Sequence, residues 1–308
     1  MRSLLLAAVL VLSLVACNRA AQQEPLPSDA PSVTVTQAPA TAAPDPTDAT
    51  ELASPTASPA ASPAASEPAA GQVVQLFFLR TNNRGDYYFM EPERHQLGSR
   101  TAAIAKATME LLVSTQPRDP SLTNLVPDGT TVLGVTLKDG LLTVDLDFPT
   151  GGIDLGSSFE GWGYTQLVHT GAQFGSVKRV RILHKGKPPT SGHFEDPGAA
   201  SRPDPFDVAP VVVESPQHDD TVDAGTVTFR GTANVFEATV DLKLKDQSGT
   251  VIEDSFTTAT CGTGCRGDWE HQFTIAQPGR YTLVAAGSDV SDGEGPPPFA
   301  ARRHFVVE

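Results

Sequence analysis

Between positions 73 and 120, apolar residues are first consecutive and then recur at the wider spacing of a helix. The stretch 73–79 is almost wholly apolar, as a buried strand is, and 87–90 follows a turn as its partner strand. Beyond residue 99 the apolar positions fall on one face of a helix, with Ser99 or Thr101 as its N-cap. Pro117 then bars the helix from continuing.

In the next part of the chain, apolar and polar residues alternate with a period of two. The stretches 132–137 and 142–148 flank Asp139-Gly140, which is a signal for a tight hairpin loop. We expect a second helix over 158–174 and a last strand over 177–183. Elements in this order predict a compact α+β domain in which both helices pack on one face of one sheet.

The C-terminal part of the chain, residues 210–308, contains only short runs of strand type with turn signals between them. Seven such runs at this spacing predict an all-β sandwich of immunoglobulin type, with Trp269 in its core rather than in a ligand stack. The runs are 211–213, 226–233, 238–245, 251–257, 269–275, 280–286 and 299–307.

The N-terminus has the pattern of an export signal. Arg2 precedes an apolar segment, 4–14, which is too short to span a bilayer. Residues 14–17, Leu-Val-Ala-Cys, resemble a bacterial lipobox, so we expect 1–16 to be a lipoprotein signal peptide and Cys17 to be lipidated. The protein would then be lipid-anchored at the extracytoplasmic face of the cell membrane. The alternative is a secreted protein with a spare thiol.

Two segments are rich in proline. Residues 17–72 consist mainly of Ala, Pro, Ser, Thr and acidic residues without apolar periodicity, which predicts a disordered tether. As a coil it would reach about 40 Å, and as stretched polyproline about 170 Å. Residues 189–209 predict an inter-domain linker. The folded domains would therefore be 73–188 and 210–308.

Charge is spread unevenly over a chain whose formal net charge is −14. Residues 73–190 hold 12 Lys+Arg against 11 Asp+Glu, whereas 210–308 hold 7 against 15, a balance of −8. Because no basic field is available to hold a polyphosphate backbone, we expect no nucleic-acid partner. No motif calls for a cofactor.

Two cysteines remain once Cys17 is assigned to lipid. Cys261 and Cys265 form the string Cys-Gly-Thr-Gly-Cys, and an even remainder in an exported chain predicts one disulfide. Two free thiols are the alternative. A closed zinc site would need more ligands than these two residues supply.

The helix ending in 109–112, the turn 125–130 and the hairpin 139–146 resemble the N-terminal domain of the GerM sporulation and spore-germination proteins. Residues 164–170, followed by 177–186, continue the resemblance in the family's order. The resemblance implies a non-enzymatic, extracytoplasmic assembly domain with a fold similar to ring-building domains of secretion-type complexes. One departure is the insertion at 149–154.

The string 231–240, Gly-Thr-Ala-Asn-Val-Phe-Glu-Ala-Thr-Val, lies between Ser215-Pro216 and the turn 246–249. Together these segments resemble the immunoglobulin-like domain of bacterial spore-germination proteins, which commonly follows a GerM-like domain. The resemblance implies an adhesive or scaffolding role without an assigned active site.

Candidate chemistry is sparse. Asp145 and Asp147 share one face of a strand and could form the carboxylate pair of a glycosidase, but solvated acids explain them as well. His169 on the second helix is a packed histidine rather than a general base. His193, Glu195 and Asp196 lie close together and could form a metal site, but a loop gives no preorganised geometry, so solvated residues are the better interpretation. The loop 289–294 only partly matches a calcium loop.

The sequence therefore predicts a lipid-anchored binding or scaffold protein of the bacterial cell envelope that is not an enzyme. The expected partners are the membrane, through the lipid, and an envelope protein or cell-wall polymer, with self-association into a homo-oligomer as a further expectation. The alternative is a wall-active hydrolase or lytic factor, which would require a pocket with convergent acids.

Overall fold

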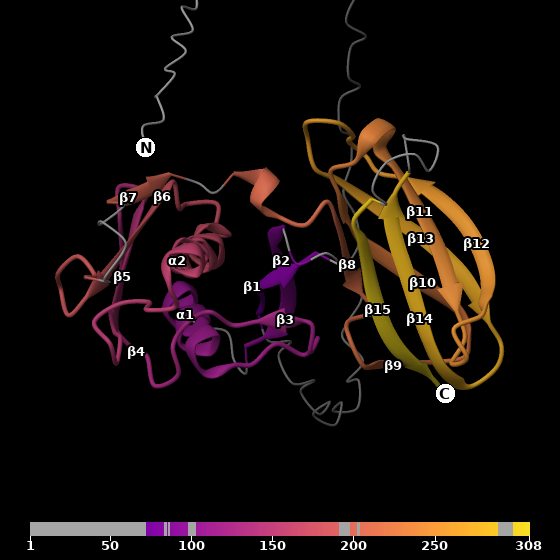
Figure 1. Ribbon diagram of the computed structural model, residues 1–308, viewed down its shortest axis with the longest axis horizontal. Helices are drawn as coiled ribbons and strands as arrows, with labels where there is room; N and C mark the ends of the chain where they lie inside the picture. Colours follow the sequence, from indigo (N-terminus) through magenta and orange to yellow (C-terminus); the bar gives the residue numbers. More distant parts are fainter. Residues whose placement is uncertain are drawn as a thin grey trace, which may run out of the picture. The chain divides into compact units, whose positions relative to one another are not determined.

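The computed structural model describes residues 72–82, 85, 87–97, 103–190, 198–201, 204–288 and 298–308, all within one compact unit, Ala64–Glu308 (Figure 1). Several sequence expectations lie outside the described residues. These are the signal peptide, Cys17, the tether up to residue 71, the caps Ser99 and Thr101, the group His193, Glu195 and Asp196, and the loop 289–294.

The first domain has two sheets and two helices. One sheet has the strand order β2-β1-β3 and the other β4-β5-β6-β7, in which only β5 and β6 are parallel. The elements are β1 (Val73–Thr81), β2 (Tyr88–Gln96), α1 (Ile104–Ser114), β3 (Leu122–Thr123), β4 (Thr131–Lys138), β5 (Leu141–Asp147), α2 (Ser157–Ala172), β6 (Arg179–His184) and β7 (Ala199–Ser201).

The α+β class is confirmed, but the strands divide between two sheets rather than forming one. The helices lie between the sheets (Figure 1). Leu76 and Phe78 of β1 pack on one side of the helical layer, and Leu142 and Val144 of β5 pack on the other. Each helix thus buries apolar residues on two faces, which one sheet could not cover. Packing explains the glycine at position 163 of α2, because a Cβ there would lie 2.8 Å from the Ile153 side chain.

The second domain is the expected sandwich of two sheets. All seven predicted strands are present, and one short strand, β9, was not predicted. Its sheets have the orders β13-β10-β8 and β12-β11-β14-β15-β9. The strands are β8 (Val211–Ser215), β9 (Asp220–Val222), β10 (Gly225–Ala233), β11 (Thr239–Lys245), β12 (Val251–Thr258), β13 (Gly267–Ile275), β14 (Gly279–Gly287) and β15 (Ala300–Val307). A turn of 3-10 helix, η2 (Phe236–Ala238), leads into β11.

The core of the sandwich is aromatic and aliphatic. Phe229, Trp269, Leu283 and Phe305 belong to one buried cluster, and Trp269 is a core residue as the sequence predicts. Gly231 is essential to this packing, because a Cβ at its position would overlap a carbonyl oxygen of β8 and lie 2.7 Å from the Trp269 ring.

Part of the stretch predicted as a linker is regular structure. β7 pairs with β6, and a turn of 3-10 helix, η1 (Pro205–Asp207), precedes a bridge between Met90 and Val208. The Arg266 guanidinium donates to the carbonyl oxygens of Val208 and Ala209. The proline content of this stretch led to the prediction of a linker. Proline is nevertheless compatible with η1, because Pro205 lies in its first turn, where no amide donor is needed.

Candidate functional site: a buried charged junction and the basic pocket beside it

Three charged side chains of the first domain meet where β1, β2 and the segment after α1 converge. Arg80 Nε donates to Glu91 Oε2 at 2.7 Å, and Arg80 Nη2 donates to Asp119 Oδ2 at 2.7 Å. Ser121 accepts a further bond from Arg80. The side chains of Arg80, Glu91 and Asp119 are all nearly inaccessible to solvent.

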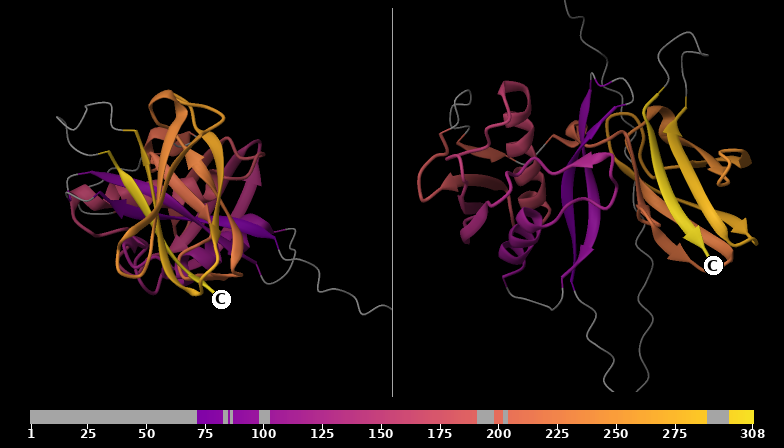
Figure 2. Two further views of the ribbon diagram at one scale, coloured as in Figure 1. Left: turned by 90° about the vertical axis from the view of Figure 1, so that its right-hand side faces the viewer. Right: turned by 60° about the horizontal axis from the view of Figure 1, so that its bottom comes forward.

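A fourth charge comes from the immunoglobulin-like domain. Arg303 of β15 donates through Nη2 to Glu91 Oε1 at 3.0 Å and to the Val213 carbonyl oxygen at 2.8 Å. Its Nη1 lies 3.7 Å from Asp119 Oδ2, and its side chain is 2% exposed. We call Arg80, Glu91, Asp119 and Arg303 the charged junction. It forms where β2 lies beside β8 (Figures 1 and 2).

Asp119 of the junction and the neighbouring Glu93 are held in the ionised form. Burial raises the pKa of Asp119, but the charge of Arg80 and hydrogen bonds from Ser121 outweigh it and leave the pKa at about 2. Burial likewise raises the pKa of neighbouring Glu93, and hydrogen bonds from His95 and two backbone amides outweigh it, so that this pKa is lowered. Asp119 is therefore a carboxylate at neutral pH, paired with the Arg80 guanidinium.

His218 connects the junction to a pocket on the outer face of the sandwich. Its Nδ1 lies 3.8 Å from Asp119 Oδ2, beyond hydrogen-bond distance, and its Nε2 lies 3.7 Å from Asp219 Oδ2. Its buried ring meets the ring of His304 edge-on, with 5.3 Å between centroids.

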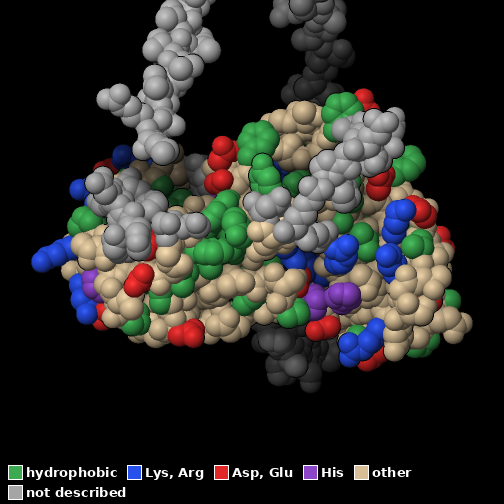
Figure 3. Space-filling view, viewed as in Figure 1, with side chains coloured by type: hydrophobic (Ala, Val, Ile, Leu, Met, Phe, Trp, Pro, Cys, Tyr) green, Lys and Arg blue, Asp and Glu red, His purple; other side chains and the backbone are tan. Residues whose placement is uncertain are grey.

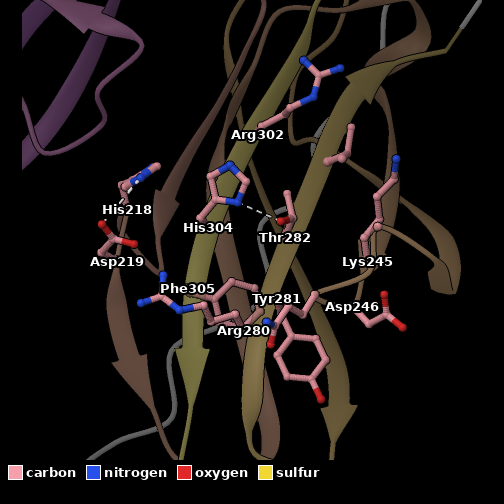
Figure 4. Close-up of a pocket in the computed structure, with 13 residues that line it drawn as sticks. His218, Asp219, Lys245, Asp246, Arg280, Tyr281, Thr282, Arg302, His304 and Phe305 are labelled. Atoms are coloured by element: carbon pink, nitrogen blue, oxygen red, sulfur yellow. Dashed lines mark hydrogen bonds and ion pairs between the residues drawn. The ribbon is translucent and has the colours of Figure 1, made fainter.

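This pocket has a volume of about 590 Å³ and is lined by β14, β15, the end of β11 with the turn that follows it, and His218 and Asp219. Figure 4 shows Lys245, Arg280 and Arg302 around a central pair, in which Thr282 Oγ1 and His304 Nδ1 are 2.8 Å apart. Partial burial, and then the nearby His218, lower the pKa of His304. In the space-filling view of Figure 3, histidine side chains lie among Lys and Arg side chains on this part of the surface. We call this cavity the basic pocket.

The paired acids of the first domain have structural partners. Asp145 Oδ1 accepts from the backbone amide of Gly186 at 2.8 Å, and Asp147 Oδ1 lies 2.8 Å from Lys185 Nζ. Both carboxylates thus hold the turn that follows β6, which matches the interpretation of these residues as hairpin acids.

His169 is packed, as expected. Its ring lies against Phe77, with centroids 5.0 Å apart, and its Nε2 is 3.4 Å from Asp207 Oδ2 of η1. The histidine therefore connects α2 to the segment between the domains.

Cys261 and Cys265 are bonded to each other in the connection between β12 and β13, with Cα atoms 5.8 Å apart. Among the described residues, no group of three His, Cys, Asp or Glu side chains could hold a metal ion. No helix in this part of the chain is long and apolar enough to cross a membrane.

Sequence reasoning missed both the charged junction and the basic pocket, although a signal existed for the junction. Along β15, Ala301, Phe305 and Val307 point into the core, and Arg303 shares their alternation. A charge at a core position of a strand requires a buried counter-charge. The basic pocket gave no local signal, because its cations come from three separate strands.

The fold and the junction define a two-domain protein, in which an α+β domain is joined by buried ion pairs to an immunoglobulin-like sandwich. Residues 75–190 match the family model Germane, described as sporulation and spore germination. Residues 210–294 match the family model Gmad2, described as the immunoglobulin-like domain of bacterial spore germination. The chain therefore combines a GerM-like domain with an immunoglobulin-like domain, as the sequence predicts.

Two solved structures illustrate the similarity. The tandem GerMN domains of the sporulation protein GerM from Bacillus subtilis share 18% identity over 46% of this chain and 49% of that chain, with a TM-score of 0.36. The first GerMN domain of the same protein shares 20% identity over 44% of this chain and 96% of that chain, with a TM-score of 0.30. The chain thus spans about half the length of the tandem-domain structure. No curated protein matches.

Proposed function

We propose that the protein is a lipid-anchored, extracytoplasmic binding and scaffold protein of the bacterial envelope that serves sporulation or germination without catalysing a reaction. The GerM-like domain assembles with other components, and the immunoglobulin-like domain contacts a protein or wall polymer. The observation that carries this proposal is the charged junction, in which Arg303 of one domain is buried against Glu91 and Asp119 of the other.

Buried ion pairs between domains support a scaffold because they fix an arrangement more than they add stability. Such pairs are costly to desolvate, and their best-attested role is to specify geometry. Two domains held together present their outer surfaces to a partner at once, so binding loses less conformational freedom. The acids Asp145 and Asp147, which a glycosidase would use, instead hold a turn.

The anchor is tested by Cys17→Ser. Stable attachment requires more than one acyl chain, since each buried methylene contributes about 0.8 kcal/mol. We expect the wild-type protein in the membrane fraction with acylated Cys17 by mass spectrometry, and the variant in the soluble extracytoplasmic fraction. The double variant Cys261→Ser/Cys265→Ser, which leaves Cys17 intact, should stay in the membrane fraction. An unmodified, soluble wild-type protein would refute the anchor.

The binding role is tested by crosslinking in intact cells, comparing the wild type with Arg303→Met. We expect the wild type to capture a defined envelope component and the variant to capture less of it at equal protein level. Turnover of purified peptidoglycan by the wild-type protein would instead establish the hydrolase.

A further inference from the structure

Three of the seven cations of the acidic immunoglobulin-like domain lie around one pocket. The domain contains seven Lys+Arg residues and fifteen Asp+Glu residues. Arg303 and Arg266 are engaged at the junction and at the segment between the domains. Arg230 pairs with Glu270, and Lys243 pairs with Asp254. Lys245, Arg280 and Arg302 all line the basic pocket.

The acids that share this pocket are largely occupied by local partners. The Asp246 carboxylate accepts from the backbone amides of Ser248 and Thr250 within its own turn. Asp219 lies beside His218. Within the described residues, no ion pair engages Lys245 or Arg280. The pocket lining therefore carries three cations against two carboxylates, a small local excess of positive charge in a domain that is acidic overall.

The central pair adds directional donors. His304 and Thr282 face each other across β15 and β14, and the contact between Thr282 Oγ1 and His304 Nδ1 leaves Nε2 of His304 directed to other partners. When the threonine hydroxyl donates to Nδ1, the proton of the neutral ring is on Nε2, which is then a donor. Cations and donors from three strands line the same pocket (Figure 4).

This arrangement suits a phosphate better than a carboxylate. A planar carboxylate is satisfied by a single guanidinium fork, whereas a tetrahedral phosphate presents oxygens in several directions. The volume of about 590 Å³ is much larger than one phosphate group needs. A ligand that fills it must continue beyond its first anionic group, as a polymer with repeated phosphodiesters does.

We propose that the basic pocket binds a phosphodiester-bearing cell-wall polymer through Lys245, Arg280, Arg302 and the Thr282–His304 pair. This inference rests on the proposed function for the source of the anion, since an envelope protein meets such polymers outside the cytoplasm. The proposed ligand class of the immunoglobulin-like domain is therefore a phosphodiester polymer.

The test is the binding of poly(glycerol phosphate) to residues 18–308, measured by calorimetry at about 0.15 M salt. We expect Lys245→Gln/Arg280→Gln to weaken binding at least about tenfold, since two charged contacts are lost. The matched control Lys243→Gln removes the same type of charge on β11, outside the pocket, and should stay within about twofold. Unchanged Trp269 fluorescence shows that the variants are folded, and Arg280→Lys should retain part of the affinity.

The proposal is overturned by no binding of the polymer by the wild type, by an equal loss in Lys243→Gln, or by tighter binding to phosphatidylglycerol vesicles than to the polymer. Inorganic phosphate at equal phosphate concentration should bind more weakly, and equal affinity would remove the polymer from the proposal. The protein could also be retained on cell walls from which phosphate polymers have been removed, with equal retention of the wild type and the double variant. That result would refute this site and leave the scaffold role unaffected. Loss of envelope localisation would refute the scaffold role alone.

Discussion

Replacing Arg303 by Met tests whether the charged junction holds the two domains together. Methionine keeps an unbranched stem but removes the charge and the bonds to Glu91 and to the Val213 carbonyl oxygen. Arg80 then remains as the one guanidinium facing two buried carboxylates, Glu91 and Asp119. Removing one partner from a buried ion-pair network costs about 3–5 kcal/mol, because a charge is left uncompensated.

The chain offers a matched control for this substitution. Arg230 Nε and Glu270 Oε2 are 2.7 Å apart, the same distance as in the Arg80–Glu91 pair, but their side chains are 57% and 51% exposed. Arg230→Met should therefore cost only about 0–1 kcal/mol, as exposed pairs generally do. The difference between the two variants isolates the effect of burial at the junction.

The assay uses the two tryptophans of the chain, one in each domain. Trp162 lies on α2 and Trp269 lies in the sandwich core. Urea unfolding of residues 18–308, followed in Trp162→Phe and Trp269→Phe backgrounds, reports the domains separately. We expect coincident transitions in the wild type and separated ones in Arg303→Met.

A second substitution distinguishes lost charge balance from lost packing. Glu91→Gln added to Arg303→Met removes the uncompensated carboxylate, so the double variant should be less destabilised than the sum of the two single changes. The reasoning fails if Arg303→Met costs no more than Arg230→Met, or if the two tryptophans still report one transition after the substitution.

Further predictions concern single positions. Gly231→Ala should cost more than about 2 kcal/mol in urea unfolding, since its Cβ overlaps a carbonyl oxygen of β8, whereas Gly134→Ala, which has open space, should change stability by less than about 0.5 kcal/mol. Reducing the Cys261–Cys265 bond, whose residues are only four apart, should cost about 2 kcal/mol, measured with and without reductant. The pKa of Asp119, about 2, lies below its unfolded value, so its contribution of about 2 kcal/mol is present above pH ~4 and is lost as the pH falls toward 2. Unfolding midpoints measured across this range should show a loss that Asp119→Asn lacks.

Local patterns allowed much of the fold to be predicted. Alternation around Leu242 and Leu283 identified strands whose inward residues form the sandwich core, and all seven predicted strands are present. The division of the first domain into two sheets was not predictable in this way. It depends on β3 joining the β1–β2 hairpin while β4 to β7 form a sheet of their own, and pairing between strands that are distant in the sequence has no local signature.

The site was less predictable because its members are distant in the sequence. Glu91 and Arg303 are 212 residues apart, and neither neighbourhood predicts the other. Glu91 lies opposite Phe78 in the β1–β2 register, so an acid within this apolar pairing was a signal of a buried partner. Identifying that partner required the fold.

The register of β15 determines both features of the site. Along this strand Arg302 and His304 line the basic pocket, whereas Arg303 between them enters the charged junction. Pairing with β14 fixes this alternation, because His304 lies opposite Thr282 and Phe305 opposite Tyr281. A slip of one residue would move Arg303 to the pocket side and bring His304 to the junction. The burial of Phe305 and Val307 in the sandwich core opposes such a slip, so the hydrophobic core of one domain sets the position of both the inter-domain ion pairs and the proposed anion contacts.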